Sequence, residues 1–167
     1  MVLTKSELIG LLKNEVRILL HLAGKVEPHM VDYRPTPTQR SPLELLQYLT
    51  IMGPELIKGV KSGFSMEAWT AAENAAKALT FEQTVDALRA HSDTYAKLLG
   101  DWSDEDFRTE VEMFGDTSSR GAIVVNMVLG GCAAYRTQLF LYLKSCGRHE
   151  LSTMNLWAGM DAPTASH

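Results

Sequence analysis

Cysteine is scarce in this sequence, and its two cysteines cannot form a disulfide with each other. Among 167 residues only Cys132 and Cys146 carry thiols. Both fall in one expected helix, where a rise of about 1.5 Å per residue places them roughly 21 Å apart. A disulfide needs Cα atoms within about 7 Å. Because free thiols persist in reducing compartments, we expect a cytoplasmic protein.

Long apolar runs are also missing. A transmembrane helix needs about 20 predominantly apolar residues, yet the most apolar stretch, residues 122–135, leads directly into Arg136 and Gln138. The opening residues, MVLTKSE, lack the apolar segment and the small-residue cleavage site of a secretory leader. We therefore expect no membrane partner.

Basic runs and the common catalytic motifs are absent too. The formal net charge is −4, and lysine and arginine nowhere cluster. Because nucleic-acid binders carry a cationic face, we expect no nucleic-acid partner. The chain has no glycine-rich phosphate loop, no catalytic serine elbow and no CxxC pair. The acidic turn at 101–107 lacks the ligand spacing and the glycine of a calcium loop.

What the sequence does contain is apolar periodicity typical of helices. Such stripes, bounded by capping residues and glycines, predict long helices over about 4–24, 41–63, 80–100 and 120–146. An alanine-rich segment at 65–78 predicts a short peripheral helix. Pro54 lies inside the second long helix and should kink it. Residues 109–114 alternate and could be briefly extended, but no strand pair is expected. The pattern favours an all-α helix bundle.

Four motifs in this order resemble the DinB/YfiT-like family of four-helix bundles. The connector YRPTP at 33–37 and the turn SDEDF at 103–107 resemble the family's connector into helix two and its turn after helix three. The segment YRTQL at 135–139 resembles the family's His-Arg-Gly-Gln helix, and Trp157 matches a tryptophan near its C-terminus. The resemblance implies a DinB-like antiparallel four-helix bundle with one long crossover connection and a short extra helix. We expect one domain over residues 1–160 and a loose tail at 161–167.

The resemblance also implies a site of three metal-binding histidines, one on helix two and two on the last helix. In this sequence those positions fall at Tyr48, Gly131 and Tyr135, and none is a histidine. Glycine has no side chain, and tyrosine is a poor ligand unless its phenol, with a pKa of about 10, is ionised. We therefore expect a vacated site that holds no metal and no other cofactor.

The histidines that are present are scattered. They are His21, His29, His91, His149 and His167. A relocated site would need at least three of them to converge. His21 and His91, on different helices, have no second histidine or carboxylate one turn later on the same face, and the other three lie outside the long helices. We expect them to be exposed or hydrogen-bonded.

Two interpretations of the vacated site remain open. Tyr48, Gly131 and Tyr135 can line a metal-free pocket, with Met52 and Met127 one helical turn away. Alternatively, the two rings fill the space and the methionines are ordinary core residues. Gly130 and Gly131 inside one helix are consistent with room for a ligand or with close helix approach, as at a dimer contact.

Two further residues are expected near the rim of such a pocket. Arg136 matches the family's arginine and is expected to pair with Glu55 or Glu44. Trp157 is expected to cover the mouth of the bundle or to pack at a subunit contact. Cys132 has no neighbouring base, so we expect an inert thiol.

The leading hypothesis for function is a non-catalytic bundle. It binds a small molecule or acts as a dimeric scaffold, with a homodimer as the expected assembly, because the missing ligands argue against an enzyme. The alternative is a divergent thiol-dependent transferase or hydrolase that uses Tyr48 or Tyr135 as an acid–base group.

Overall fold

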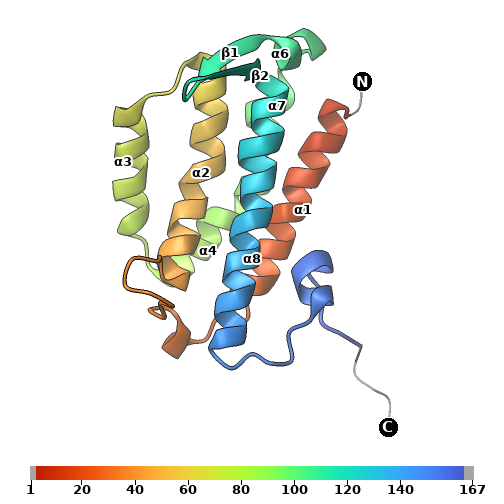
Figure 1. The fold of residues 1–167 in the computed structure, drawn as a ribbon. Coiled ribbons are helices and arrows are strands. Elements are labelled where there is room, and N and C mark those ends of the chain that lie inside the picture. Colours follow the sequence, from red (N-terminus) through yellow and green to blue (C-terminus); the bar gives the residue numbers. More distant parts are fainter. Residues whose placement is uncertain (1–2, 164–167) are drawn as a thin grey trace.

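Four long helical segments form the body of the protein in the computed structural model, which describes residues 3–163 (Figure 1). They are α1 (Lys5–Ala23), α2 (Pro42–Ser62), α4 with α5 (Phe81–Arg89 and His91–Gly100), and a continuous run of α7 (Arg120–Ile123), the π-helical turn η2 (Val124–Leu129) and α8 (Gly130–Ser145). The predicted last helix is confirmed, with a π-helical turn that its sequence did not indicate.

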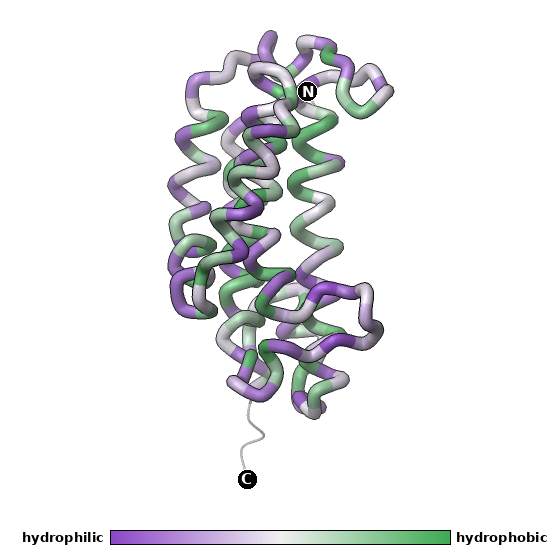
Figure 2. Tube along the Cα trace, turned by 90° about the vertical axis from the view of Figure 1, so that its left-hand side faces the viewer, coloured by the Kyte–Doolittle hydropathy of each residue, from purple (hydrophilic) through white to green (hydrophobic). Residues whose placement is uncertain are grey.

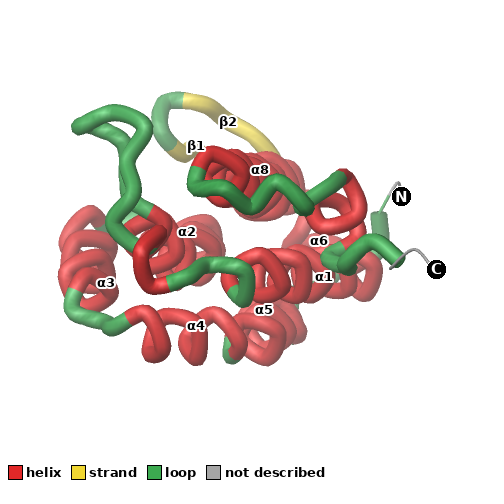
Figure 3. Tube along the Cα trace, turned by 90° about the horizontal axis from the view of Figure 1, so that it is seen from below, coloured by secondary structure: helices red, strands yellow, loops and turns green. Residues whose placement is uncertain are grey.

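Viewed along the bundle axis, α1, α2, α5 and α8 surround one core (Figure 3). Helix α3 (Met66–Lys77) lies outside this ring and packs on α2. Because α3 carries the chain back along the bundle, α2 and the α4–α5 segment run in the same direction (Figure 1). This is the predicted four-helix bundle with one crossover connection and one short extra helix.

Capping boxes begin three of the long segments. At each start a hydroxyl accepts the backbone N–H three residues on, and the side chain of that residue accepts the N–H of the cap. The pairs are Thr4 with Glu7, Ser41 with Glu44, and Thr80 with Gln83. The second and third of these boxes are readable in the sequence, and they place α2 and α4 within one residue of the expected starts.

A β-hairpin caps one end of the bundle, and the expectation of no strand pair was wrong. Strands β1 (Glu110–Met113) and β2 (Asp116–Ser119) are antiparallel, with Met113 opposite Asp116. The two-residue turn places both Phe114 (φ 55°) and Gly115 (φ 83°) in the left-handed region. Such turns match the twist of paired strands. Phenylalanine rarely adopts this conformation, so the turn carries a weak sequence signal.

The segment predicted as one helix over 80–100 is divided. Helices α4 and α5 meet at Ala90, which ends the first helix and precedes the second. Three short elements complete the fold: η1 (Pro28–Met30), α6 (Asp104–Arg108) and the π-helical turn η3 (Met154–Ala158).

The core is a continuous layer of aliphatic side chains between the helices. Among its fully buried members are Leu12, Leu22, Leu45, Leu46, Ile57, Leu88, Leu99, Leu139 and Leu143. Hydrophilic and hydrophobic residues alternate along the helices accordingly (Figure 2). No helix in residues 3–163 is both long and apolar enough to cross a membrane.

The C-terminal segment packs against α1. The Asp161 carboxylate lies 2.6 Å from Lys25 Nζ and accepts a hydrogen bond of 3.0 Å from Asn155 Nδ2. Residues 164–167 of the predicted loose tail lie outside the described residues. The division at residue 160 therefore stays a prediction.

Candidate functional site

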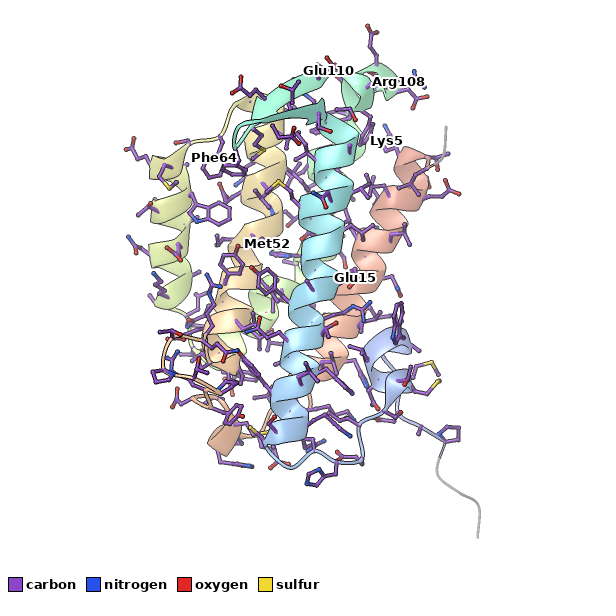
Figure 4. The ribbon with its side chains drawn as sticks, viewed as in Figure 1. Lys5, Glu15, Met52, Phe64, Arg108 and Glu110 are labelled. Carbon is purple, nitrogen blue, oxygen red and sulfur yellow. The ribbon has the colours of Figure 1, made fainter. Side chains whose placement is uncertain are left out.

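The positions that correspond to the expected metal ligands meet between α2 and α8. The rings of Tyr48 on α2 and Tyr135 on α8 pack edge-to-face with centroids 5.3 Å apart. Met52 lies one turn beyond Tyr48, about halfway along α2 (Figure 4). A Cβ atom at Gly131 would lie 3.1 Å from both the Cε and the Sδ atoms of Met52. The structure thus brings Tyr48, Met52, Gly131 and Tyr135 together.

The space beside Gly131 is occupied by a side chain. Met52 is only 2% exposed, and its thioether lies where a side chain at position 131 would be. A flexible methionine fills irregular gaps well. Met127, the fifth predicted residue, lies elsewhere, because it lines a hollow of about 320 Å³ beside the β-hairpin, together with Phe114 and Asn126.

These residues do not fit a metal ion. Burial, and then the neighbouring Tyr135 phenol, raise the pKa of Tyr48 to about 12, so its hydroxyl is not ionised at neutral pH. A thioether and a glycine add no hard ligand. Within residues 3–163 no group of three histidine, cysteine, aspartate or glutamate side chains is arranged to hold a metal.

Burial also governs the other ionisable groups in this part of the core. It raises the pKa of the Cys132 thiol to about 12, and the Glu15 carboxylate adds to that effect. Both cysteines are free thiols. Burial likewise raises the pKa of Tyr95 well above its ordinary value. At neutral pH none of these groups supplies a thiolate or a phenolate.

An aromatic row extends outward from Tyr48. Trp69 on α3 packs against Tyr48 with centroids 6.1 Å apart, and Phe64 lies 5.7 Å from Trp69. Phe64, near the end of α2 (Figure 4), in turn contacts Phe114 of the hairpin turn at 4.8 Å. The sequence interpretation missed this row because it treated 65–78 only as a peripheral helix. An aromatic residue on either side of the α3 start was the available signal.

A groove of about 440 Å³ opens beside Tyr48, between the start of α2 and the end of α3. Its walls are formed by Arg40, Glu44, Gln47, Tyr48, Glu73, Ala76 and Lys77. The guanidinium carbon of Arg40 lies 4.0 Å from the centroid of the Tyr48 ring, in cation–π contact. Tyr48 therefore lies both in the cluster with Met52, Gly131 and Tyr135 and at the wall of an open surface groove.

The carboxylates of the groove already have partners. Both oxygens of Glu44 accept hydrogen bonds from Arg34, at 2.5 and 2.6 Å, and these bonds hold the pKa of Glu44 below its ordinary value. Glu73 lies 3.4 Å from Lys77. Gln47 donates a hydrogen bond of 2.9 Å to the Leu79 carbonyl. Arg40, in contrast, makes no ion pair and no side-chain hydrogen bond with any residue from 3 to 163.

The expected pairing of Arg136 with Glu55 or Glu44 was wrong. Arg136 binds Glu15 of α1, with contacts of 2.6 and 3.2 Å to its two oxygens, and donates to the Leu156 carbonyl. Its guanidinium carbon lies 5.6 Å from the centroid of the Trp157 ring. Successive residues of a helix point about 100° apart, so Tyr135 faces α2 while Arg136 faces α1. The two residues predicted at the pocket rim thus lie together on the α1 side.

The buried His91 and the half-buried His21 are both hydrogen-bonded. Nε2 of His91 lies 2.9 Å from the Thr50 carbonyl oxygen, and Nε2 of His21 lies 3.1 Å from Asn155 Nδ2. Burial lowers the pKa of both.

No protein-family model matches the chain, and no curated protein does either. Among solved structures, the crystal structure of a DinB-like protein, YjoA from Bacillus subtilis, is similar, with a TM-score of 0.66 and 16% sequence identity. The match covers 87% of this chain and 94% of that one. At this identity the likeness concerns the fold, and it agrees with the four motifs of the sequence. The chain therefore has the helical-bundle fold of that DinB-like protein.

Proposed function

We propose that this protein is a non-catalytic DinB-like bundle that binds a small organic molecule in the groove beside Tyr48. The observation that carries the proposal is the groove itself. Its volume of about 440 Å³ is that of a typical small-molecule site, and it combines an aromatic ring with polar side chains. In a chain with no histidine at 48, 131 or 135, this groove opens beside Tyr48, one of those three positions.

The absence of catalysis is supported by the protonation states. A catalytic thiol or acid–base tyrosine needs a pKa near or below the working pH. Burial acts in the opposite direction here, because it raises the pKa of Tyr48 and that of Cys132 to about 12. A divergent thiol-dependent transferase or hydrolase would therefore find no activated group at Tyr48 or at Cys132.

A homodimer and a cytoplasmic location also belong to the proposal. Apolar side chains that a monomer leaves exposed can be covered by a second copy. Trp157 is 69% exposed, and Met160 in the same C-terminal segment is exposed as well. Light scattering of the wild-type protein and of Trp157→Ser tests the dimer. A monomeric mass for the wild type at micromolar concentration would contradict it.

A fragment library screened by ligand-observed NMR tests the binding function. We expect hits whose binding is lost in Tyr48→Leu, because that change removes the aromatic wall of the groove. Tyr33→Leu is the matched control, since Tyr33 is another half-buried tyrosine in an edge-to-face pair, with Tyr142 at 5.8 Å, and it is not part of the groove wall. Hits that bind both variants equally, or an absence of hits, would contradict the proposal.

A further inference from the structure

Arg40 occupies a special position in the groove. It is the residue immediately before Ser41, the cap of α2, so its backbone is anchored at the start of a long helix. Its guanidinium lies over the Tyr48 ring at 4.0 Å. Stacking on an aromatic face holds a guanidinium in place while leaving its N–H edge free to bind a planar anion. Arg40 is thus positioned before any ligand arrives.

The donors of Arg40 are unused. A guanidinium carries five N–H donors in a fixed fork. The neighbouring Arg34 directs its fork to both oxygens of Glu44, whereas Arg40 has no such partner in the described chain. Guanidinium groups bind carboxylates in a bidentate manner. The Arg40 guanidinium, which is unpaired and lies on the Tyr48 ring at the wall of the groove, is therefore suited to bind an anionic group.

The surrounding charges agree with this assignment. The groove and its immediate surroundings contain three cationic side chains and two carboxylates. They are Arg34, Arg40 and Lys77, and Glu44 and Glu73. Arg34 neutralises Glu44, and Lys77 lies beside Glu73. The positive charge left over is that of Arg40. An organic cation is disfavoured, because it would meet the like charge of Arg40 at the wall of the groove.

From these contacts we infer that the groove selects a small organic molecule bearing a carboxylate, and that Arg40 binds this group. The inference rests on the binding function proposed above. The half-buried Tyr48 ring, which lines the groove, offers apolar surface for the body of such a molecule. Arg40 is then the residue that determines specificity by charge, and Tyr48 is the residue that holds Arg40 in position.

Three probes of the same size and different charge test the inference: phenylacetate, 2-phenylethanol and 2-phenylethylamine. Each is titrated into the full chain, labelled with ¹⁵N, while the indole N–H signal of Trp69, which contacts Tyr48, is followed. We expect phenylacetate to bind in the millimolar range and the neutral and cationic probes to bind at least about tenfold more weakly, because a hydrogen-bonded charge contributes that much.

Arg40→Gln should weaken phenylacetate binding by at least about tenfold and bring it to the level of the alcohol. Arg108→Gln is the control, since it removes the same charge from the exposed helix α6, beside the hairpin at the other end of the bundle (Figure 4). Each variant replaces a side chain at the surface, so both should fold. Circular dichroism checks this.

Three outcomes overturn the inference in different ways. If the alcohol or the amine binds as tightly as phenylacetate and Tyr48→Leu abolishes that binding, the groove is a binding site but does not select carboxylates. If no probe shifts the Trp69 signal while fragments from the library bind in a Tyr48-dependent manner, the carboxylate inference fails and the binding function stands. If neither the probes nor the fragments bind, both fail.

Discussion

The Nε2 atom of His91 lies 2.9 Å from the Thr50 carbonyl oxygen, which is the carbonyl that Pro54 leaves without a helical partner. A carbonyl in a helix normally accepts the N–H four residues on, and proline has none. Because a carbonyl can only accept, Nε2 of His91 must carry the proton. A buried histidine of α5 thus supplies the donor that Pro54 lacks, and it joins α5 to α2.

The burial of His91 predicts how stability depends on pH, because it outweighs the opposing effect of the bond to Thr50 on the pKa of the imidazole. Burial lowers the pKa of His91 in the folded protein, whereas the unfolded histidine keeps a pKa of about 6.5. As pH falls below about 6.5, the unfolded state therefore takes up the proton first. The contribution of His91 to the free energy of unfolding decreases progressively over this range and stops decreasing once pH lies below the folded pKa. Urea unfolding between about pH 7 and about pH 5 measures the slope.

His91→Gln should flatten that slope, because glutamine can donate a hydrogen bond but does not titrate. His149→Gln makes the same chemical change at an exposed residue outside the core. An identical pH slope in the wild type and in His91→Gln would show that the buried imidazole does not govern the acid sensitivity.

Gly53 is required by the position of Tyr95. A Cβ atom at residue 53 would lie 2.1 Å from the Tyr95 hydroxyl oxygen and 2.9 Å from its Cζ atom. Tyr95 is 1% exposed, so its ring cannot move aside without displacing other core side chains. We expect Gly53→Ala to lower the free energy of unfolding by about 1–3 kcal/mol.

Denaturant unfolding of two further variants separates the clash from the general effect of alanine. Gly10→Ala is the control, because a Cβ at that helical position meets nothing within 4 Å and should stabilise the protein by up to about 1 kcal/mol. Tyr95→Phe removes the closest atom, so it should recover part of the loss in the double variant. Equal effects of alanine at residues 10 and 53 would disprove the steric requirement.

The buried pair of Arg136 and Glu15 should contribute more to stability than any surface pair. Arg136→Met leaves the Glu15 carboxylate without its partner in a half-buried place and removes the donor to Leu156, at a cost of about 3–5 kcal/mol. Arg89→Met, which breaks an exposed pair with Asp86, should cost less than about 1 kcal/mol.

Replacing both members of the buried pair tests the origin of the loss. Glu15→Leu combined with Arg136→Met should be more stable than Arg136→Met alone, because no uncompensated charge remains. Limited proteolysis should also detect earlier cleavage in the segment 154–163 of Arg136→Met, since Arg136 holds the Leu156 carbonyl. A cost equal to that of Arg89→Met would contradict a structural role for the pair.

The helices could be predicted from the sequence because their signals are local. Apolar periodicity and the boxes that begin at Ser41 and Thr80 depend on neighbours within four residues. The ion pair of Arg136 with Glu15 spans 121 residues, so nothing in the sequence near Arg136 could select Glu15 over Glu44 or Glu55. The hairpin was missed for a different reason, because its turn depends on a positive φ at Phe114, which that residue type does not indicate.

The candidate site was predictable only in part. Counting helical positions from Ser41 and Arg136 places Tyr48 and Tyr135 opposite each other, and their rings do meet. The filling of the space beside Gly131 by Met52 depends on side-chain packing across two helices. The position of Arg40 over Tyr48 could not be foreseen, because the connector before Ser41 has no periodicity from which to place a side chain.

Restoring three histidines should create a metal site if positions 48, 131 and 135 are a vacated one. Histidines at 131 and 135 would share one face of α8, opposite the histidine at 48. A histidine at residue 131 would collide with the Met52 thioether, which lies 3.1 Å from a Cβ at that position. Met52→Ala is therefore added to Tyr48→His, Gly131→His and Tyr135→His. We expect the quadruple variant to bind one equivalent of zinc, because three imidazoles with an open position form a typical zinc site. Titration against a chromophoric chelator measures the affinity, and the same protein with Gly131 retained should bind far more weakly. Equal affinity in the two proteins would mean that residue 131 does not point into the shared site, and the assignment of a vacated metal centre would be wrong.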